Sequence, residues 1–328
     1  MLNWNIIGHQ EQIKFLEKSL NNNHLNHAYI FAGPKFIGKE KIAKLFAQSI
    51  ICEKIQNQTS DKPCNDCPNC KQFQKAIYSD FYEINLSDGK KDISIEQIKQ
   101  LQYQITLKSF LGNYKIALIN NADKLNKASA NALLKTLEEP PANTIIILLT
   151  SHLKSLLPTI ISRCQLLKFG YVNQDLIYKY LVDQGERRDK AKIISRWSQG
   201  RPEIILNQNF ENLLIKHNSY REIIENILKA PEYKRLQILD EFFKNSKDDK
   251  VENYLEVWQT FIHDLFLIKT YNNEKVVNQD ATDFLTSISN LFSFKKISQL
   301  LKNISLISNQ LKQNINSKIL FENLFLNI

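Results

Sequence analysis

The segment from Gly33 to Glu40, read as GPKFIGKE, has the spacing of a phosphate-binding loop. Gly33 and Gly38 allow backbone N–H groups to close around a polyphosphate, and Lys39 adds a positive charge. The segment ends in Glu40, at the position where such a loop needs a Ser or Thr hydroxyl to hold magnesium. It therefore predicts a loop whose backbone can bind ATP or ADP. Whether nucleotide is bound stays open, and hydrolysis is not expected.

The acidic residues of a working ATPase are also missing from their expected place. They belong at the end of a following strand, where one holds magnesium and one polarises water. Here the apolar segment 115–119 is followed by Asn120 and Asn121, and an amide cannot act as a general base. Asp123 comes slightly later and is expected to cap the next helix or to pair with a lysine. This second, independent loss also indicates that the pocket does not hydrolyse ATP.

Four of the five cysteines lie close together in the sequence and form a candidate metal-ligand set: Cys52, Cys64, Cys67 and Cys70. Two overlapping C-x-x-C steps and one upstream thiol supply four sulfur ligands for tetrahedral zinc. A reducing cytosol disfavours the alternative, disulfide bonds, and a catalytic thiol would need a histidine that is not nearby in sequence. We therefore predict a structural zinc site that is closed to water and helps to fold a small module.

Short apolar segments alternate with helical patterns over the first half of the chain. The expected strands cover 28–32, 81–85, 116–119, 145–150 and 166–169. Continuously apolar strands separated by helices are typical of a parallel sheet that is covered on both faces. The phosphate-binding loop follows the first of these strands and precedes a helical pattern. The sequence thus predicts an α/β nucleotide-binding fold, with the zinc module inserted after the helix that carries Lys39.

The pattern changes near 170–174 and is helical from there to 328. Breaks near 185, 200–202 and 230–231 suggest three domains. These are an α/β domain at 1–170 with a zinc module at about 52–70, a small helical lid domain at 171–208, and a helical collar domain at 209–328. The collar contains an apolar stripe that we expect to be core, although so long a helical domain could also serve oligomerisation: Tyr254, Val257, Trp258, Phe261 and Leu265.

The composition favours a phosphate-rich partner without proving one. The 328 residues carry a net charge of +9 and give a pI of about 9.1, which suits contact with DNA. A chain this rich in Lys, Asn and Ile could owe the same excess to an AT-rich genome, so charge alone leaves the question open. The sequence shows no apolar segment of transmembrane length and no signal sequence at Met1. We expect a cytoplasmic protein with no membrane partner.

Further motifs carry a family resemblance: NALLKTLEEPP at 131–141, Thr150-Ser151 at the end of a predicted strand, and Ser162-Arg163-Cys164. With these motifs the chain resembles the AAA+ clamp-loader ATPases. Its zinc module and degenerate nucleotide site are most similar to those of the delta-prime subunits of bacterial DNA polymerase III. The resemblance is strong over residues 5–208 and extends beyond them only in helical character. It also relates residues 6–10 to the adenine-side segment of the family.

The resemblance implies a role for Arg163. In this family nucleotide sites form between neighbouring subunits, and the arginine of the Ser-Arg-Cys motif reaches the γ-phosphate held by the next subunit. Arg163 would then act in trans as an arginine finger. The simpler alternative is that Arg163 pairs with a carboxylate at the edge of the domain. Glu203 falls near the position of the second sensor arginine of ATP-hydrolysing relatives, and Arg201 is two positions away, so that role is not transferred.

The implied function is that of a non-hydrolysing stator subunit of the DNA polymerase III clamp loader in DNA replication. The implied partners are the tau/gamma and delta subunits, the sliding clamp and primed DNA, in a hetero-oligomer. One alternative is an ATP-hydrolysing tau/gamma-type subunit, which Glu40, Asn120 and Asn121 oppose. The other is a zinc-containing nucleic-acid-binding protein on an inactive ATPase fold, which only the identity of the partners separates from the first choice.

Overall fold

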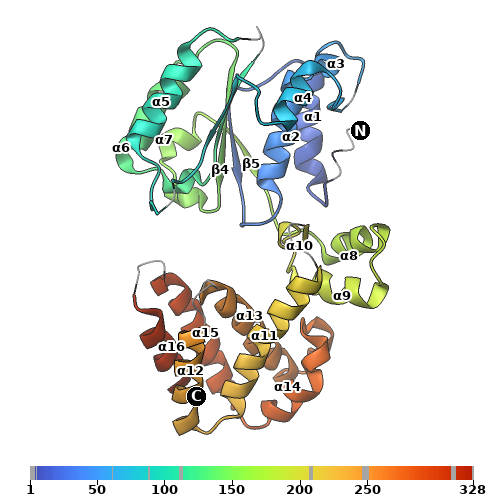
Figure 1. The fold of residues 1–328 in the computed structure, drawn as a ribbon, viewed down its shortest axis with the longest axis vertical. Helices are drawn as coiled ribbons and strands as arrows, with labels where there is room; N and C mark the ends of the chain where they lie inside the picture. The colour runs from blue at the N-terminus through green and yellow to red at the C-terminus, as the bar shows by residue number, and fades with distance from the viewer. Residues whose placement is uncertain are drawn as a thin grey trace. The chain divides into compact units, whose positions relative to one another are not determined.

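The computed structural model describes residues 4, 6–60, 62–87, 89–110, 114–206, 210–245, 251–311 and 315–326. The chain divides into two compact units (Figure 1). Unit 1 comprises Met1–Tyr180 and Gln199–Ile204, and unit 2 comprises Leu181–Ser198 and Ile205–Ile328. The predicted boundary between 208 and 209 lies outside the described residues, so the division into three domains stays a prediction.

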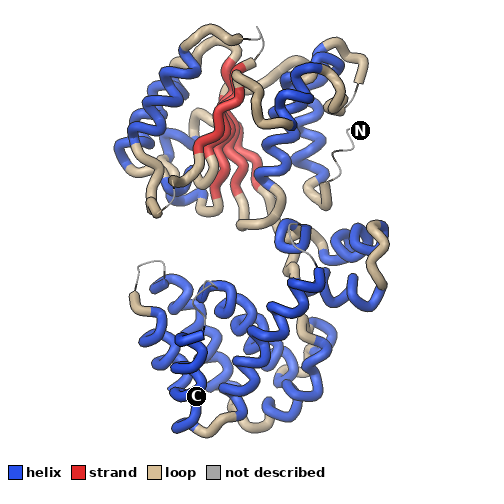
Figure 2. Tube along the Cα trace, in the orientation of Figure 1, coloured by secondary structure: helices blue, strands red, loops and turns tan. Residues whose placement is uncertain are grey.

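Unit 1 is built on a parallel sheet of five strands, drawn in red in Figure 2. The strands are β1 (Ala28–Ala32), β2 (Phe81–Ile84), β3 (Lys115–Ile119), β4 (Thr144–Thr150) and β5 (Gln165–Lys168). Their order across the sheet is β2-β3-β4-β1-β5. Ala32 pairs with both Thr150 and Lys168, so the carboxyl ends of the central strands lie at one edge of the sheet. Each strand predicted from the sequence is confirmed to within one residue at either end.

Helices cover both faces of this sheet (Figure 1). One face packs against α1 (Gln10–Asn21), α2 (Lys39–Ile51) and α4 (Pro68–Gln74), and the other against α5 (Ile95–Thr106), α6 (Lys127–Glu138) and α7 (Pro158–Ile161). Strand side chains alternate between these two cores: Tyr29 and Phe31 enter the first, whereas Ala28 and Ile30 enter the second. Burial on both faces explains why the strands are apolar throughout. The predicted α/β fold is confirmed.

Shorter elements connect these layers. They are α3 (Glu53–Gln56), η1 (Ala122–Lys124) and η2 (Leu153–Ser155). After β5 come α8 (Gln174–Asp183), α9 (Arg188–Trp197) and α10 (Glu203–Leu206). Among the described residues that follow β5, every regular element is helical, as the sequence predicts.

Most of unit 2 is a helical bundle around α13. Its main helices are α11 (Phe210–Lys229), α12 (Glu232–Asn245), α13 (Val251–Lys269), α14 (Thr282–Ser289), α15 (Phe294–Leu311) and α16 (Ser317–Leu326), with η3 (Asn273–Lys275) and η4 (Gln279–Ala281) between α13 and α14. Trp258 on α13 is fully buried, contacts Phe321 edge-on and donates its indole N–H to Tyr220 O at 2.8 Å. Phe261 and Leu265 are also fully buried, so the apolar stripe belongs to the core. Within the described part of the chain, no helix combines the length and apolar character needed to span a membrane.

Candidate functional site

The predicted phosphate-binding loop lies between β1 and α2, at the edge where the strands end. The Gly33 N–H donates to Thr150 O at the end of β4, at 3.1 Å. A Cβ atom at Gly33 would lie 2.2 Å from Phe169 O, so only glycine fits this position. Gly38, directly before α2, has a φ of 102°, which also favours glycine. Both glycines of the motif therefore serve the backbone shape of the loop.

Lys39 is the first residue of α2, and its side chain is buried. Its Nζ donates to Gly33 O at 2.7 Å and also to Pro34 O. An ammonium group has three N–H donors, so one remains for a ligand. Burial lowers the pKa of Lys39 to about 8, while the carboxylates of Glu203 and Asp123 act in the opposite direction. Lys39 therefore lies where it can bind an anion, but two of its three N–H donors already bind carbonyl groups of its own loop.

A cavity of about 280 Å³ opens beside Lys39. Its lining includes residues from the loop, from the ends of the strands and from the start of α10. The ionisable side chains that line it are two lysines and two glutamates, namely Lys35, Lys39, Glu40 and Glu203. Because these charges balance, the lining provides no positive excess to attract a polyphosphate.

The carboxylate of Glu40 is engaged in a surface ion pair. It lies 2.7 Å from Lys44 Nζ, one turn further along α2, and half of the Glu40 side chain is exposed. Lys44 also contacts Glu83 on β2, at 3.1 Å. Position 40 therefore places negative charge at the cavity rim, where a magnesium-binding hydroxyl would be needed for hydrolysis.

Asn120 and Asn121 follow β3 and line the cavity. The Asn120 side-chain amide donates to Glu83 Oε1 at 2.8 Å and to Asn85 Oδ1 at 2.7 Å. An aspartate at position 120 would lose both donations and would place a second carboxylate against Glu83. Asn121 adopts the left-handed backbone conformation, with φ of 51°, which asparagine tolerates well. The end of β3 therefore presents amides to the cavity in place of acids.

Asp123 has a function that the sequence did not predict. Its Oδ1 accepts hydrogen bonds from Thr150 Oγ1 at 3.1 Å and from the Ser151 N–H at 3.0 Å. It thereby connects the segment after β3 to the end of β4. The expectation that Asp123 caps the next helix was wrong, because Asn126 caps α6 by accepting from the Ser129 N–H at 2.8 Å. In agreement with the alternative, a lysine partner, the carboxylate of Asp123 interacts electrostatically with Lys39.

Glu203 completes the cavity from a distant part of the sequence. Its backbone N–H donates to Phe36 O at 3.0 Å, and its side chain lines the cavity beside Lys39, where the Gly38 N–H favours the charged carboxylate. Burial and the nearby Glu40 raise the pKa of Glu203, whereas Lys39 and the Gly38 N–H act against this rise. The structure thus places a carboxylate at the N-terminus of α2. Sequence reasoning located Glu203 by resemblance and assigned it no contact.

The N-terminal segment predicted to lie on the adenine side packs against the same loop. His9 Nε2 lies 2.8 Å from Ile37 O, and its ring meets Phe169 edge-on. Burial lowers the pKa of His9, which favours the neutral ring. His9 therefore supports the loop directly and fixes the start of α1 against it.

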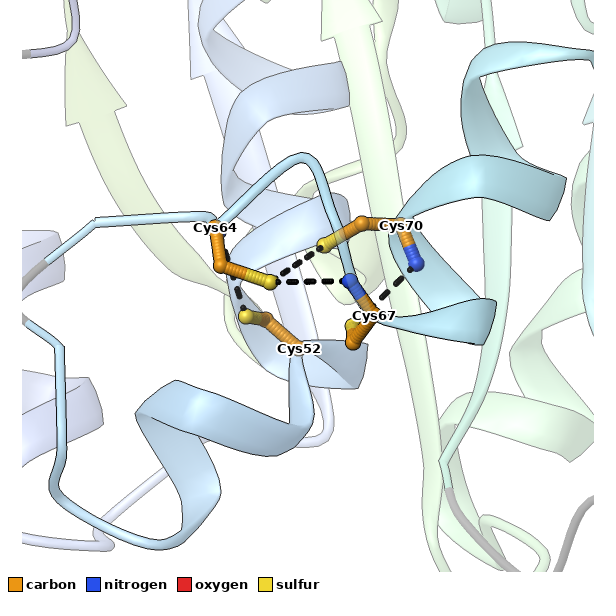
Figure 3. Close-up of side chains that lie close together, drawn as sticks. All are labelled: Cys52, Cys64, Cys67 and Cys70. Carbon is orange, nitrogen blue, oxygen red and sulfur yellow. Dashed lines mark hydrogen bonds between the residues drawn. The ribbon is translucent and has the colours of Figure 1, made fainter.

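The four cysteines of the predicted metal site come together in Figure 3. Their Sγ atoms all lie within 4.8 Å of one another, and those of Cys64 and Cys70 are 4.0 Å apart. A disulfide would need about 2.05 Å, whereas a zinc–sulfur bond of about 2.3 Å gives a tetrahedral edge of roughly 3.8 Å. All five cysteines lie in the described part of the chain and are free thiols. The geometry therefore fits a metal and excludes the disulfide alternative.

Backbone N–H groups point at these sulfur atoms, as the dashed lines of Figure 3 show in part. Cys67 N–H donates to Cys64 Sγ at 3.2 Å, Cys70 N–H to Cys67 Sγ at 3.5 Å, and Cys64 N–H to Cys52 Sγ at 3.4 Å. Burial acts to raise the pKa of Cys64, but the N–H groups of Cys67 and Asp66 lower it to about 6. Such donors stabilise the thiolate form that binds metal.

The cysteine module is attached directly to α2. Cys52 is the residue immediately after this helix. Asn69 donates its side-chain N–H to Ile51 O at 3.0 Å, and Asn65 Oδ1 accepts from Gln48 on α2 at 3.0 Å. The module thus closes onto the C-terminal turn of the helix that begins at Lys39.

Arg163 lies at the opposite edge of the sheet from Lys39. It precedes β5, whereas Lys39 follows β1, and these two strands are parallel neighbours. A strand of four residues such as β5 spans about 13 Å. The Arg163 guanidinium contacts Glu138 Oε1 at 2.8 Å and donates to Thr159 O at 3.0 Å, and its side chain is 36% exposed. The structure therefore separates Arg163 from the pocket of its own chain and shows the ion pair foreseen as the simpler alternative.

Cys164, the fifth cysteine, is separate from the metal-ligand set. It packs against the core between the sheet and α5–α7. Burial raises its pKa to about 12, so the thiol stays protonated and unreactive.

Two family models match the chain. One, described as the DNA polymerase III delta subunit, matches residues 8–173, and one for the C-terminal part of that subunit matches 215–328. The delta' subunit of Bacillus subtilis is 26% identical over 317 residues, which cover 96% of this chain and 94% of that protein. The delta' subunit of Haemophilus influenzae is 29% identical over 196 residues, covering 60% and 58% of the two chains.

Gamma subunits of DNA polymerase III also match the chain. The DNA polymerase III gamma subunit of Buchnera aphidicola is 34% identical over 176 residues, which cover 54% of this chain and 47% of that subunit. This match spans about half the length of that gamma subunit. The gamma subunit of Buchnera aphidicola from Schizaphis graminum is 28% identical over 295 residues, which cover 84% of this chain and 79% of that subunit. On the two model matches, the chain belongs to the DNA polymerase III delta-subunit family of clamp-loader proteins.

Proposed function

We propose that this chain is a delta-prime-type stator of the DNA polymerase III clamp loader, which does not hydrolyse ATP itself and donates Arg163 to a neighbouring ATPase subunit. The observation that carries the proposal is the separation within one sheet between a phosphate-binding pocket with amides at 120 and 121 and an arginine at the other edge. The partners would be the tau/gamma and delta subunits, the sliding clamp and primed DNA, in the cytoplasm.

The position of Arg163 supports action in trans. At the amino edge of the sheet it is remote from Lys39, so any triphosphate it meets would be bound by another subunit. Its resting partner Glu138 is half exposed, and an exposed ion pair contributes only about 0–1 kcal/mol. Exchange of this pair for a γ-phosphate would therefore cost little. A forked guanidinium that is always charged can stabilise the transferred phosphoryl group, an effect on the order of 10³ to 10⁵ in rate.

The cysteine cluster would hold one structural zinc ion. Four sulfur donors at tetrahedral spacing are the ligand set that zinc prefers for closed sites. Cys52, Cys64, Cys67 and Cys70 would fill all four positions, which leaves no position for a reacting water. The metal would fold the module onto α2 and would take no part in hydrolysis.

The second candidate function is an ATP-hydrolysing gamma-type subunit, which the 34% identity to the Buchnera gamma subunit favours. Glu40 and Asn120 oppose it, because the first pairs with Lys44 and the second donates to Glu83. A magnesium ligand and a general base would both have to come from elsewhere.

Reconstitution tests the proposal. The purified chain, mixed with tau/gamma and delta subunits, is expected to elute from gel filtration as one stable complex. Failure to co-elute would reject the clamp-loader function and would favour a separate nucleic-acid-binding protein.

The Arg163→Ala variant then tests the finger within that complex. We expect normal assembly and a lower ATPase rate stimulated by DNA and clamp, since one neighbouring site loses its guanidinium. Glu138→Ala is the matched control, because it breaks the same ion pair and leaves the arginine in place. An equal defect in both variants, or an unchanged rate in Arg163→Ala, would refute the finger.

A further inference from the structure

We propose that Glu203 is a built-in ligand of the phosphate-binding loop, whose carboxylate takes the place of a nucleotide phosphate and so keeps nucleoside diphosphates out of the pocket. This inference concerns the pocket of the isolated chain and goes beyond the function proposed above.

The first support is the position of Glu203 at the N-terminus of α2. Backbone N–H groups at such a terminus bind phosphates and carboxylates alike, because they have no partners within the helix. Here Glu203 lines the cavity at this terminus together with Lys39, and the Gly38 N–H favours the charged form of its carboxylate. Lys39 lies in the same cavity and interacts with the same carboxylate.

The second support is that the backbone holds Glu203 in this position. Its N–H donates to Phe36 O at 3.0 Å, within the loop itself. Three residues earlier, Gly200 accepts from the Val172 N–H at 2.9 Å, and a Cβ there would lie 2.7 Å from Val172 O. A segment fixed at both points delivers its carboxylate at high effective concentration, so a free anion must compete with a tethered one.

The third support is the charge balance of the cavity. With Glu203 ionised, the lining has two lysines against two glutamates. Glu40 is already paired with Lys44, so neutralising Glu203 would leave Lys35 and Lys39 as the dominant charges. A ligand with two phosphates is the chemical class that the emptied loop would accept.

Binding of fluorescent ADP to the full-length, zinc-replete chain tests this proposal, in buffer without magnesium or chelator. Glu203→Gln removes the charge and keeps the side-chain shape. Glu203→Ala removes the polar group altogether and so covers the case in which the amide alone blocks the loop. We expect both to bind at least about tenfold more tightly than the wild type, which corresponds to about 1.4 kcal/mol. Adding Lys39→Ala to either variant should abolish the gain.

Glu11→Gln is the matched control, because Glu11 lies in the first turn of α1 and does not line the cavity. It should bind like the wild type. The proposal is overturned if the wild type binds as tightly as the Glu203 variants, or if folded Glu203 variants gain nothing over Glu11→Gln. Neither result bears on complex assembly or on Arg163, so this test and the reconstitution can fail independently.

Discussion

The two ends of helix α2 carry two candidate ligand sites that differ in completeness. At its first residue the phosphate-binding loop keeps its glycines and lysine, but Glu40 and the amides after β3 replace the groups that handle metal and water. Directly after its last residue the cysteine cluster has all four ligands within 4.8 Å of one another. One end lacks residues that a working ATPase needs, and the other has four thiols that could hold a metal.

The difference indicates which property each end provides. A closed four-sulfur site stabilises structure and needs no open coordination position. A phosphate-binding loop without its metal ligand still shapes the backbone between β1 and α2, as the Gly33 contacts show. Helix α2 thus belongs to a scaffold with the phosphate-binding loop in place, but with Glu40 and two amides at the positions where catalytic groups are expected.

Removal of the metal should have the largest effect. The double change Cys64→Ser and Cys67→Ser leaves two sulfur ligands, so a binding free energy on the order of 10 kcal/mol is lost. We expect zinc content to fall from one per chain to none, with a lower unfolding temperature and faster hydrogen exchange in α3 and α4. Elemental analysis, thermal unfolding and hydrogen-exchange mass spectrometry measure the three effects.

Cys164→Ser is the control for metal removal, because Cys164 is outside the cluster. It should keep its zinc. Two results would contradict the predicted metal site. One is equal zinc content in the double variant and the control, and the other is wild-type protein that contains no metal after purification from zinc-containing medium.

A smaller effect is expected at the other end of α2, from the buried charge of Lys39. Its pKa falls from 10.5 in the unfolded chain to about 8 in the folded one. Between these values the unfolded state binds more protons, so the stability of the wild type rises with pH. Each pH unit is worth about 1.4 kcal/mol, which gives a gain of up to about 3 kcal/mol relative to Lys39→Met. Urea unfolding at pH 7.5 and 10.5 measures the difference.

Lys41→Met provides the control for this experiment, since Lys41 is exposed on the same helix. We expect its stability relative to the wild type to change much less over this pH range. If the difference in free energy of unfolding between Lys39→Met and the wild type did not change with pH, burial would not lower the pKa of Lys39.

The smallest effect tests whether the loop still has a structural function. A methyl group at Gly33 would collide with Phe169 O, so Gly33→Ala should cost about 1–3 kcal/mol. Gly170→Ala is the matched change, because a Cβ there meets nothing within 4 Å. Chemical denaturation should separate the two variants clearly. Equal stability would mean that the loop relaxes freely and no longer shapes the scaffold.

The sequence predicted what depends on local patterns. Continuous apolar segments predicted all five strands, since burial on both faces requires them, and cysteine spacing predicted a cluster whose members come from one short insertion. The glycine and lysine spacing predicted the loop. Each of these signals lies within a short segment of the sequence, so it does not depend on how distant segments pack together.

The contacts that shape the pocket depend on how distant segments meet. Asn120 contacts Glu83 because β2 and β3 are neighbours, and Asp123 contacts Thr150 because β3 and β4 are neighbours. Neither strand order nor side-chain direction can be read from composition or spacing. Glu203 reaches the loop from more than 160 residues away in the sequence, so only the fold could reveal that contact.

ATP turnover by the purified chain alone, compared with its Lys39→Ala variant, tests the loss of chemistry most directly. We expect both proteins to show the same background rate with magnesium present, because position 40 has no hydroxyl for the metal and positions 120 and 121 have no acid to act as a general base. A clear turnover in the wild type that disappears in Lys39→Ala would contradict a pocket without catalysis and would establish an ATPase.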